Sequence, residues 1–402
     1  IMGEKKNVVI VGAGYGGVSC AKQLDAFSEF NVFLIDQKEF FLHNVGALRA
    51  ATVPGYVNNV LFPYTSVLKN GAFICAEVKS INGTSVQVKG SETPVQFDYA
   101  VIATGTTLGF PGQTVAKSMA EARKAFADTA ERFKQCGPNI VIVGGGPVGC
   151  ELAGEIKAAN PTKNITLVCK TSQLLGSSKP KKFADKLKAT LEKNGISVIL
   201  DTGADVSQLG SEQIINGPVT LKLTNGQSLN ADMVCICIGM IKVNKESYAA
   251  SFPVTEHGQL KVNEFLQVEG NPKVFAIGDC TNILEDKLAY CAGNQSTVVA
   301  QNIKALYYKQ QLKKYSPSGF STMIVPTGPS DGASIVFGFT LGGFLTKNLK
   351  SKHLFCSKYA QLLEVAYPDG KEIQFKVPER IEKNLPTNIL EGLNIGAMAQ
   401  AK

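Results

Sequence analysis

Two glycine-rich segments of the same pattern, G-x-G-x-x-G, are the parts of this chain best suited to chemistry. Each follows an apolar, β-branched run, at residues 8–11 and 140–143, and each precedes a helical pattern. In such a turn the first glycine allows a tight bend, the second lets the backbone approach a pyrophosphate, and the third lets helix and strand pack closely. Exposed N–H groups and the helix dipole then receive the phosphates. The residues expected there are Gly12, Gly14, Gly16 and Gly17, and Gly144, Gly146, Pro147, Val148 and Gly149.

An acidic residue follows the first turn at the distance that a ribose hydroxyl requires. The strand pattern at 31–36 ends on Asp36, and dinucleotide-binding folds place such an acid about 20 residues after the turn. The second turn lacks that acid, because its matching strand, 165–168, is followed by Lys170. A lysine there favours the 2′-phosphate of NADPH, although a solvated lysine surface explains it equally well. Three further lysines follow in the same stretch: Lys179, Lys181 and Lys182.

Two such turns in one chain indicate two dinucleotides held face to face, the layout of a flavoprotein that takes hydride from a nicotinamide. We therefore expect FAD at the first turn and NADPH at the second, with NADH as an alternative. Three more apolar runs, 98–105, 232–239 and 273–280, end in small residues. The last run contains Asp279, which we expect to hydrogen-bond the ribityl chain of the flavin. An N-cap of the following helix is the alternative, and Asp279 is compatible with both.

The order of these elements predicts an α/β fold with two Rossmann-like dinucleotide-binding domains and a C-terminal α+β region. We assign 1–112 and 240–303 to the FAD-binding domain, 113–239 to the NAD(P)H-binding domain, 304–363 to a C-terminal interface region and 364–402 to an extra tail. Within the last two, the expected elements are antiparallel strands at 320–325 and 333–339, a short helix at 344–358, and a hairpin turn at 367–371 between strands at 362–366 and 372–377.

The composition favours a reducing compartment and a protein without a metal centre. Ten cysteines are scattered and none forms C-x-x-C, which also argues against a disulfide reductase. Only three histidines are present and none has ligand spacing, so we expect no metal site. No stretch approaches 18 uninterrupted apolar residues, and the first strand pattern begins at residue 8. We therefore expect a cytoplasmic protein with no transmembrane segment and no signal or transit peptide.

The net charge of +8 is concentrated in one block. Between residues 302 and 358 there are eight lysines and a single acid, Asp331. Such a block is compatible with anionic lipid, nucleic acid or a nucleotide phosphate, and a plain solubilising face is the alternative. Base-stacking aromatic residues are sparse there, so we expect no nucleic-acid partner.

Several stretches go beyond generic nucleotide-binding signatures: 40–50, 144–155, 262–270, 275–280, 287–290 and 330–332. With them the chain resembles the ferroptosis suppressor protein branch of the apoptosis-inducing-factor-like flavoproteins. Those are FAD-dependent NAD(P)H:quinone reductases, similar in architecture to type II NADH dehydrogenases. The resemblance runs from Asn7 to Lys358. The glycine that the family myristoylates corresponds to Gly3, although Asn7 stands where Ser or Thr is preferred.

The resemblance implies roles for four residues. Glu151, two residues past the second turn, orients the nicotinamide or handles a proton, with a helix-dipole partner as the alternative. Lys350 matches a family lysine at the isoalloxazine edge, where a cation stabilises the anionic reduced flavin. His43 falls in a family stretch beside the flavin, although a lone histidine in an apolar run also fits a core position. Arg49 is expected to reach the flavin phosphates as a bidentate donor.

The remaining candidates are cofactor contacts and partners. The further cofactor contacts that we expect are Val78, Ala103, Thr104, Gly105, Gly239, Lys287, Ala289 and Tyr290. The resemblance implies a quinone substrate such as ubiquinone, and a peripheral position at the lipid droplet, plasma membrane or mitochondrial surface, with an anionic membrane and a homodimer as partners. Two alternatives stay open: reduction of a soluble carrier or radical, and a non-catalytic signalling flavoprotein that binds nucleic acid.

Overall fold

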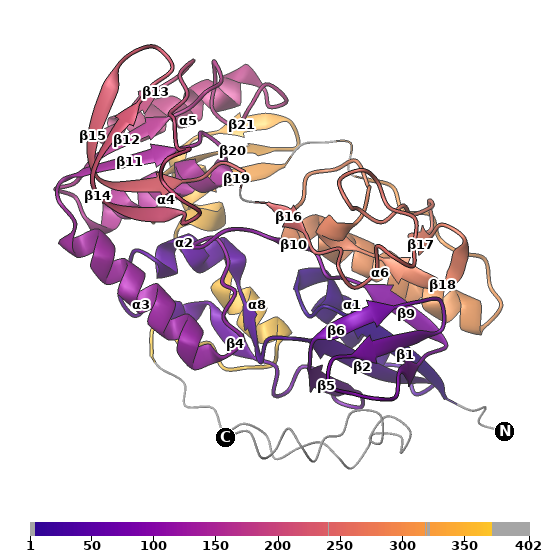
Figure 1. Ribbon diagram of the computed structural model, residues 1–402. Coiled ribbons are helices and arrows are strands. Elements are labelled where there is room, and N and C mark those ends of the chain that lie inside the picture. The colour runs from indigo at the N-terminus through magenta and orange to yellow at the C-terminus, as the bar shows by residue number, and fades with distance from the viewer. Residues whose placement is uncertain (1–4, 240, 318, 320–321, 372–402) are drawn as a thin grey trace.

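Two large sheets form two lobes, seen at the upper left and lower right of Figure 1. The computed structural model describes residues 5–239, 241–317, 319 and 322–371. The lower sheet consists of β1 (Lys6–Val11), β2 (Phe30–Asp36), β5 (Ala72–Cys75), β9 (Tyr99–Ile102), β17 (Gln267–Val268) and β18 (Asn271–Ala276). Its order is β17-β18-β9-β1-β2-β5, and only the β17–β18 pair is antiparallel. The apolar run before the first glycine turn is therefore a central, buried strand.

The upper sheet repeats this plan around the second glycine turn. Its strands are β11 (Asn139–Val143), β12 (Asn164–Val168), β13 (Ile196–Ile199), β14 (Ile214–Lys222) and β15 (Ser228–Ile236). Their order is β13-β12-β11-β15-β14, with only β14 antiparallel to its neighbour. Strand β11 lies between β12 and β15 as β1 lies between β2 and β9. The predicted α/β fold with two Rossmann-like units is confirmed.

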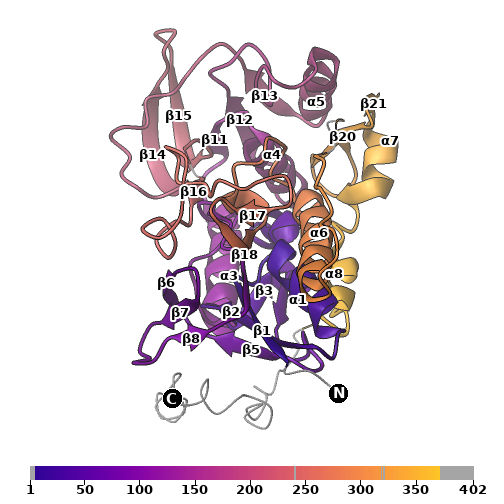
Figure 2. The same cartoon turned by 90° about the vertical axis from the view of Figure 1, so that its right-hand side faces the viewer.

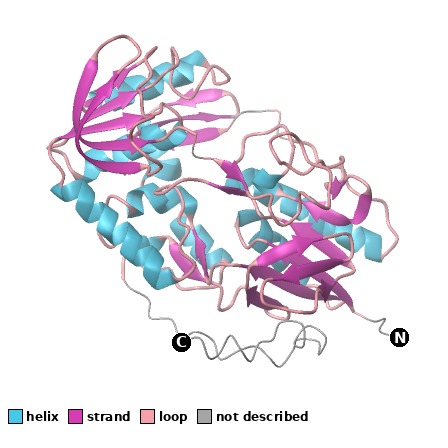
Figure 3. Cartoon of the chain, viewed as in Figure 1, coloured by secondary structure: helices cyan, strands magenta, loops and turns pink. Residues whose placement is uncertain are grey.

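Helices cover both sheets (Figure 3). They are α1 (Tyr15–Asp25), α3 (Met119–Gln135), α4 (Pro147–Ala159), α5 (Lys181–Lys193) and α6 (Ala289–Tyr307). Helix α5 buries Phe183, Leu187 and Leu191, which lie on one face at helical spacing. Helix α3 begins at a capping box in which Ser118 accepts from the Glu121 N–H. Helices α1 and α6 pack side by side in the lower lobe, as Figure 2 shows.

The structure also contains shorter elements. They are β3 (Phe40–Leu42), η1 (Asn44–Gly46), α2 (Ala47–Ala50), η2 (Tyr56–Asn59), β4 (Leu61–Pro63), β6 (Val78–Ile81), β7 (Ser85–Val88), β8 (Val95–Gln96), β10 (Thr106–Thr107), β16 (Lys242–Val243) and η3 (Gly278–Cys280). Strands β10 and β16 pair antiparallel, so the two crossings of the chain between the lobes lie side by side. Helix α2 packs against α4 of the other lobe.

The C-terminal region, yellow in Figure 1, packs on both lobes. It contains β19 (Met323–Pro326), β20 (Gly332–Val336), β21 (Phe339–Leu341), α7 (Gly343–Thr346), the π-helix η4 (Lys347–Ser351) and α8 (Cys356–Leu362). The antiparallel β19–β20 pair confirms strands within both predicted stretches, 320–325 and 333–339. Strand β19 begins at Met323, and residues 320 and 321 lie outside the described residues. Strand β20 ends before Phe337, whose φ of 50° begins a turn into β21. The predicted single helix at 344–358 is wrong: Leu354 and Phe355 adopt left-handed backbone angles that separate η4 from α8.

The predicted hairpin at 367–371 is also wrong in its first strand, because Leu362 ends α8 and residues 363–366 form no strand. Its second strand, 372–377, lies outside the described residues, as do most of the predicted tail and Gly3. Within the described part of the tail, the Gly370 N–H donates to Asn59 Oδ1 of η2 at 2.7 Å. None of the described helices combines the length and the hydropathy that a membrane span requires.

Candidate functional site

The two glycine turns have the same geometry. Gly12 has a φ of +100° and Gly144 a φ of +126°, a backbone region that favours glycine. A Cβ on Gly17 would lie 1.8 Å from the Gly12 carbonyl oxygen, and a Cβ on Gly149 would lie 1.9 Å from that of Gly144. These four positions therefore require glycine for the packing of strand against helix. Gly16 packs on Ile277, where a Cβ would lie 3.1 Å from the side chain.

Gly14 and Gly146 differ from the other glycines in the turns, because a Cβ on either would meet no protein atom within 4 Å. Each is the N-cap of its helix, α1 or α4, and neither helix has a side-chain cap. The first N–H groups of both helices therefore face open space. A side chain at Gly14 or Gly146 would project into that space and block a ligand. Pro147 and Val148 form the first turn of α4. Both turns thus fit a pyrophosphate.

Asp36 lies at the end of β2, beside the first turn. Its carboxylate accepts from the N–H of Ala13 at 2.7 Å and of Lys38 at 2.9 Å. Val78, the first residue of β6, packs partly buried against the core of the lower lobe. An acid fixed in this way beside the turn fits a ribose hydroxyl, as the sequence predicts.

The segments that follow β9 and β15 lie beside the two glycine turns and share a backbone feature. A Cβ on Gly12 would lie 2.4 Å from the Ala103 carbonyl oxygen, and Gly105 and Gly239, after β9 and β15, have φ values of +61° and +62°. Thr104 is held by Asn244 on the returning crossing: the Asn244 amide donates to the Thr104 carbonyl at 2.8 Å. Asn244 was not predicted from the sequence, since 140 positions separate the two residues.

Asp279 lies in η3, after β18, and accepts from the Thr106 hydroxyl at 3.0 Å. Burial raises the pKa of Asp279. The alternative, an N-cap role, is wrong: the next helix, α6, begins at Ala289 and its N-cap is Leu288. Tyr290 is 63% exposed in the first turn of α6. Lys287 donates to the carbonyls of Thr281 and Ile283, and burial lowers its pKa.

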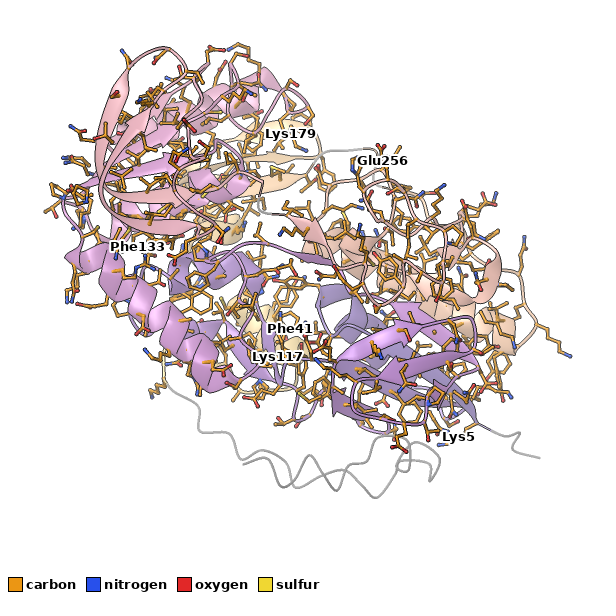
Figure 4. The ribbon with its side chains drawn as sticks, in the orientation of Figure 1. Lys5, Phe41, Lys117, Phe133, Lys179 and Glu256 are labelled. Atoms are coloured by element: carbon orange, nitrogen blue, oxygen red, sulfur yellow. The ribbon has the colours of Figure 1, made fainter. Side chains whose placement is uncertain are left out.

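The lysines after β12 separate into two groups. Lys170 is exposed near the end of β12, beside the second glycine turn. Lys179, labelled in Figure 4 on the upper lobe, contacts both Asp286 oxygens at 2.7 Å. Lys181 pairs with Asp185 one helical turn away. The prediction that Lys179 serves a 2′-phosphate is therefore wrong, because its ammonium group bridges to the segment before α6. For Lys170 the role remains a prediction.

Glu151 and Lys350, predicted separately from distant segments, meet in the structure. Lys350 Nζ lies 2.9 Å from Glu151 Oε1, and the two side chains are 12% and 14% exposed. Lys350 also donates to the Ile324 carbonyl at 3.0 Å. Burial raises the pKa of Glu151, while the Lys350 ammonium opposes that rise. The pair extends from the second turn of α4 to η4, and Lys350 is thus not part of an exposed basic face.

Arg49 does not bind a phosphate here, and that prediction is wrong. Its guanidinium is bidentate, but to Glu155: Nε to Oε2 is 2.9 Å and Nη2 to Oε1 is 2.7 Å. The other donors reach the carbonyls of Ser351 and Lys352. Glu155 was missed in the sequence, although it stands one helical turn after Glu151 and hence on the same face of α4.

His43 is fully buried and both of its ring nitrogens are occupied. Nε2 donates to the Leu354 carbonyl at 2.6 Å, and Nδ1 accepts from the Tyr15 hydroxyl at 3.0 Å. Burial lowers the pKa of His43 to about 4. The ring packs on Tyr359 of α8, with a centroid distance of 4.5 Å. The structure therefore favours the core alternative over the catalytic one, and Phe41, labelled in Figure 4, belongs to the same aromatic group.

Two lobes with matched phosphate-binding turns define a protein that holds two dinucleotides. The family model described as pyridine nucleotide-disulphide oxidoreductase matches residues 6–302, and the chain belongs to this family. It is 37% identical to apoptosis-inducing factor homolog B of Dictyostelium discoideum over 91% of this chain and 98% of the relative. It is 33% identical to ferroptosis suppressor protein 1 of Mus musculus over 87% of this chain and 94% of the relative. The resemblance found in the sequence is therefore confirmed.

Solved structures share the fold. NDH2 from Plasmodium falciparum in complex with NADH has a TM-score of 0.68 at 15% identity, over 90% of this chain and 95% of that one. The sulfide:quinone oxidoreductase of Aquifex aeolicus has a TM-score of 0.69 at 18% identity, over 91% and 92%. Together with the family, the two turns identify the chain as an FAD-dependent NAD(P)H oxidoreductase.

Proposed function

We propose that this protein passes electrons from NAD(P)H through FAD to a quinone at a membrane surface. The observation that carries the proposal is the buried Glu151–Lys350 pair, which joins the nicotinamide-side helix α4 to the C-terminal region. When bound, FAD supplies the two-electron chemistry. Glu151 orients the nicotinamide carboxamide, and Lys350 places a cation where negative charge develops.

A quinone acceptor agrees with what the chain offers for electron transfer. None of the ten cysteines forms C-x-x-C, and all ten are free thiols in the structure. Among the described residues no group of His, Cys, Asp and Glu side chains could hold a metal ion. The nucleic-acid alternative gains no support, because Tyr307 packs on Phe30 and Tyr308 hydrogen-bonds to Glu29.

The C-terminal region carries an exposed apolar surface that supports the membrane part of the proposal. Five large apolar side chains between 337 and 349 make up this C-terminal apolar surface: Phe337, Phe339, Phe344, Leu345 and Leu349, which are 44–79% exposed. A hollow of about 410 Å³ beside Phe344 is lined by three lysines, Lys186, Lys193 and Lys347, and by one acid, Asp331, which pairs with Lys193. Apolar side chains next to lysines suit an anionic lipid interface.

Steady-state oxidation of NADPH and NADH, with a short-chain ubiquinone analogue as acceptor, tests the proposal. We expect the quinone to accelerate oxidation well above the rate in air alone, with NADPH used at least as well as NADH. A rate that does not depend on the quinone, in protein that carries FAD, would refute the quinone assignment. A soluble one-electron acceptor measured in parallel tests the carrier-reductase alternative.

A further inference from the structure

Arg49 contacts three segments of the molecule at once. It lies in α2 of the lower lobe and forms a buried bidentate ion pair with Glu155 of α4, with both side chains at most 5% exposed. The same guanidinium donates from Nη2 to the Ser351 carbonyl at 2.7 Å and from Nη1 to the Lys352 carbonyl at 3.3 Å. Its face also lies over the Tyr56 ring, 5.4 Å from the centroid.

The two carbonyls that Arg49 binds follow directly after Lys350. They stand at the end of the π-helix η4, a short element whose last carbonyls need partners from outside the helix. Ser351 is fixed a second time, because its hydroxyl donates to the Asp331 carbonyl at 2.9 Å. The backbone that carries Lys350 is therefore tied to α2 through Arg49.

The acidic partner of Arg49 connects this contact to the other half of the pair. Glu155 and Glu151 lie one turn apart on α4, so each acid on this face receives one cation. The Arg49–Glu155 contact fixes α4, and the Arg49–carbonyl contacts fix the backbone next to Lys350. Since a planar guanidinium alone offers enough donors in this arrangement, lysine at position 49 cannot make all these bonds.

We infer that Arg49 and Glu155 are positioning residues that hold Lys350 against Glu151. The inference rests on the proposed function for its catalytic meaning, whereas the geometry it describes is testable without turnover. Without the Arg49–Glu155 pair, the backbone next to Lys350 loses its attachment to α2, and the Lys350–Glu151 contact is left as the side-chain link from η4 to α4, so that Lys350 becomes exposed to solvent more often.

Competitive acylation of lysines in the FAD-loaded protein, read by mass spectrometry, tests the inference. Removing one partner of a buried ion pair leaves an uncompensated charge, so the main variant replaces both: Arg49→Met with Glu155→Gln. In the wild type we expect slow acylation of Lys350 relative to exposed Lys352. In the double variant the Lys350 rate rises by about tenfold, within the range for coupled neighbours. Arg49→Lys keeps a cation opposite Glu155, so this variant should stay folded. We expect it to give a smaller rise in the acylation rate of Lys350.

The matched control is Lys22→Met with Glu364→Gln, which removes an ion pair between α1 and the segment after α8. We expect no change in Lys350 acylation there. Unchanged protection of Lys350 in Arg49→Lys and in the double variant overturns the inference, and so does a uniform rise across all lysines. The pH profile of NADPH oxidation gives a supporting readout. In the double variant its acid limb should move to higher pH, as we also expect for Lys350→Met. If the wild type fails to use a quinone while the acylation result holds, the proposed function fails and the positioning does not.

Discussion

Lys350 Nζ and Glu151 Oε1 lie 2.9 Å apart, although 199 positions separate them in the sequence. The contact crosses from η4 to α4, next to the glycine turn that we assign to the nicotinamide cofactor. It brings an acid and a base together in a largely buried place, where charge matters more than at the surface. Several measurable consequences depend on this contact and on the two glycine turns.

Replacing Lys350 by Met should slow NADPH oxidation and move its acid limb to higher pH. The Lys350 ammonium holds down the pKa of Glu151, which burial raises. Without it the carboxylate is protonated at a higher pH, and the form that orients the nicotinamide is lost earlier. We expect a rate loss on the order of tenfold to a hundredfold with FAD retained. Lys352→Met is the control, and an identical pH profile in Lys350→Met would count against the assignment.

Replacing Gly14 by Val should prevent the binding of FAD, and replacing Gly146 by Val should prevent the binding of NAD(P)H. Neither position has a protein atom near its Cβ site, so both variants should fold. Gly14→Val should yield colourless protein, whereas Gly146→Val should stay yellow and lose NAD(P)H oxidation. Gly17→Ala, whose Cβ would lie 1.8 Å from the Gly12 carbonyl oxygen, should instead fail to fold stably. Flavin absorbance and thermal melting separate these outcomes; yellow Gly14→Val protein would refute the assignment of the first turn.

Lys170→Glu should shift the preference from NADPH to NADH. An exposed lysine at the end of β12 attracts a 2′-phosphate, and a glutamate repels it. We expect the KM for NADPH to rise by roughly tenfold, with the KM for NADH nearly constant. Lys181→Glu, on a residue that pairs with Asp185, serves as the control. Equal changes for both cofactors would show that Lys170 does not contact the 2′-phosphate.

His43 should make the protein acid-sensitive. Its pKa falls from an ordinary 6.5 to about 4 in the folded state because it is buried. Between these values the unfolded chain binds a proton that the folded chain does not, so the free energy of unfolding decreases as pH falls through this window. The loss amounts to about 3 kcal/mol. In urea unfolding of His43→Gln, this part of the pH dependence of the free energy of unfolding should vanish. If the free energy of unfolding of the variant falls just as steeply with pH, His43 is not its cause.

Substitution of the C-terminal apolar surface should abolish binding to vesicles. Phe339→Ser with Phe344→Ser removes two exposed rings without opening the core. We expect the wild type to float with liposomes that contain anionic lipid and the variant to stay behind, with NADPH oxidation toward a water-soluble quinone analogue unchanged. Lys347→Glu should weaken flotation mainly at low salt. Equal flotation of all three proteins would exclude this surface as the membrane contact.

The sequence predicted what local spacing determines. Gly12, Gly17 and Asp36 occupy fixed places in the first strand–turn–helix unit, and Gly144 and Gly149 occupy the matching places in the second, so the two patterns predicted both lobes and their turns. It did not predict the Arg49–Glu155 or Lys179–Asp286 contacts, because ion pairs 106 and 107 positions apart depend on tertiary packing. The break at Leu354 and Phe355 was missed for another reason: neither residue type signals a left-handed backbone.

An anaerobic titration tests the central claim most directly. The yellow protein is first bleached with one equivalent of NADPH, and a short-chain ubiquinone analogue is then added while the flavin absorbance is followed. We predict complete bleaching and full recovery of the yellow colour with one equivalent of quinone per flavin. Protein that bleaches but does not recover with the quinone, or that does not bleach with NADPH, would contradict the account.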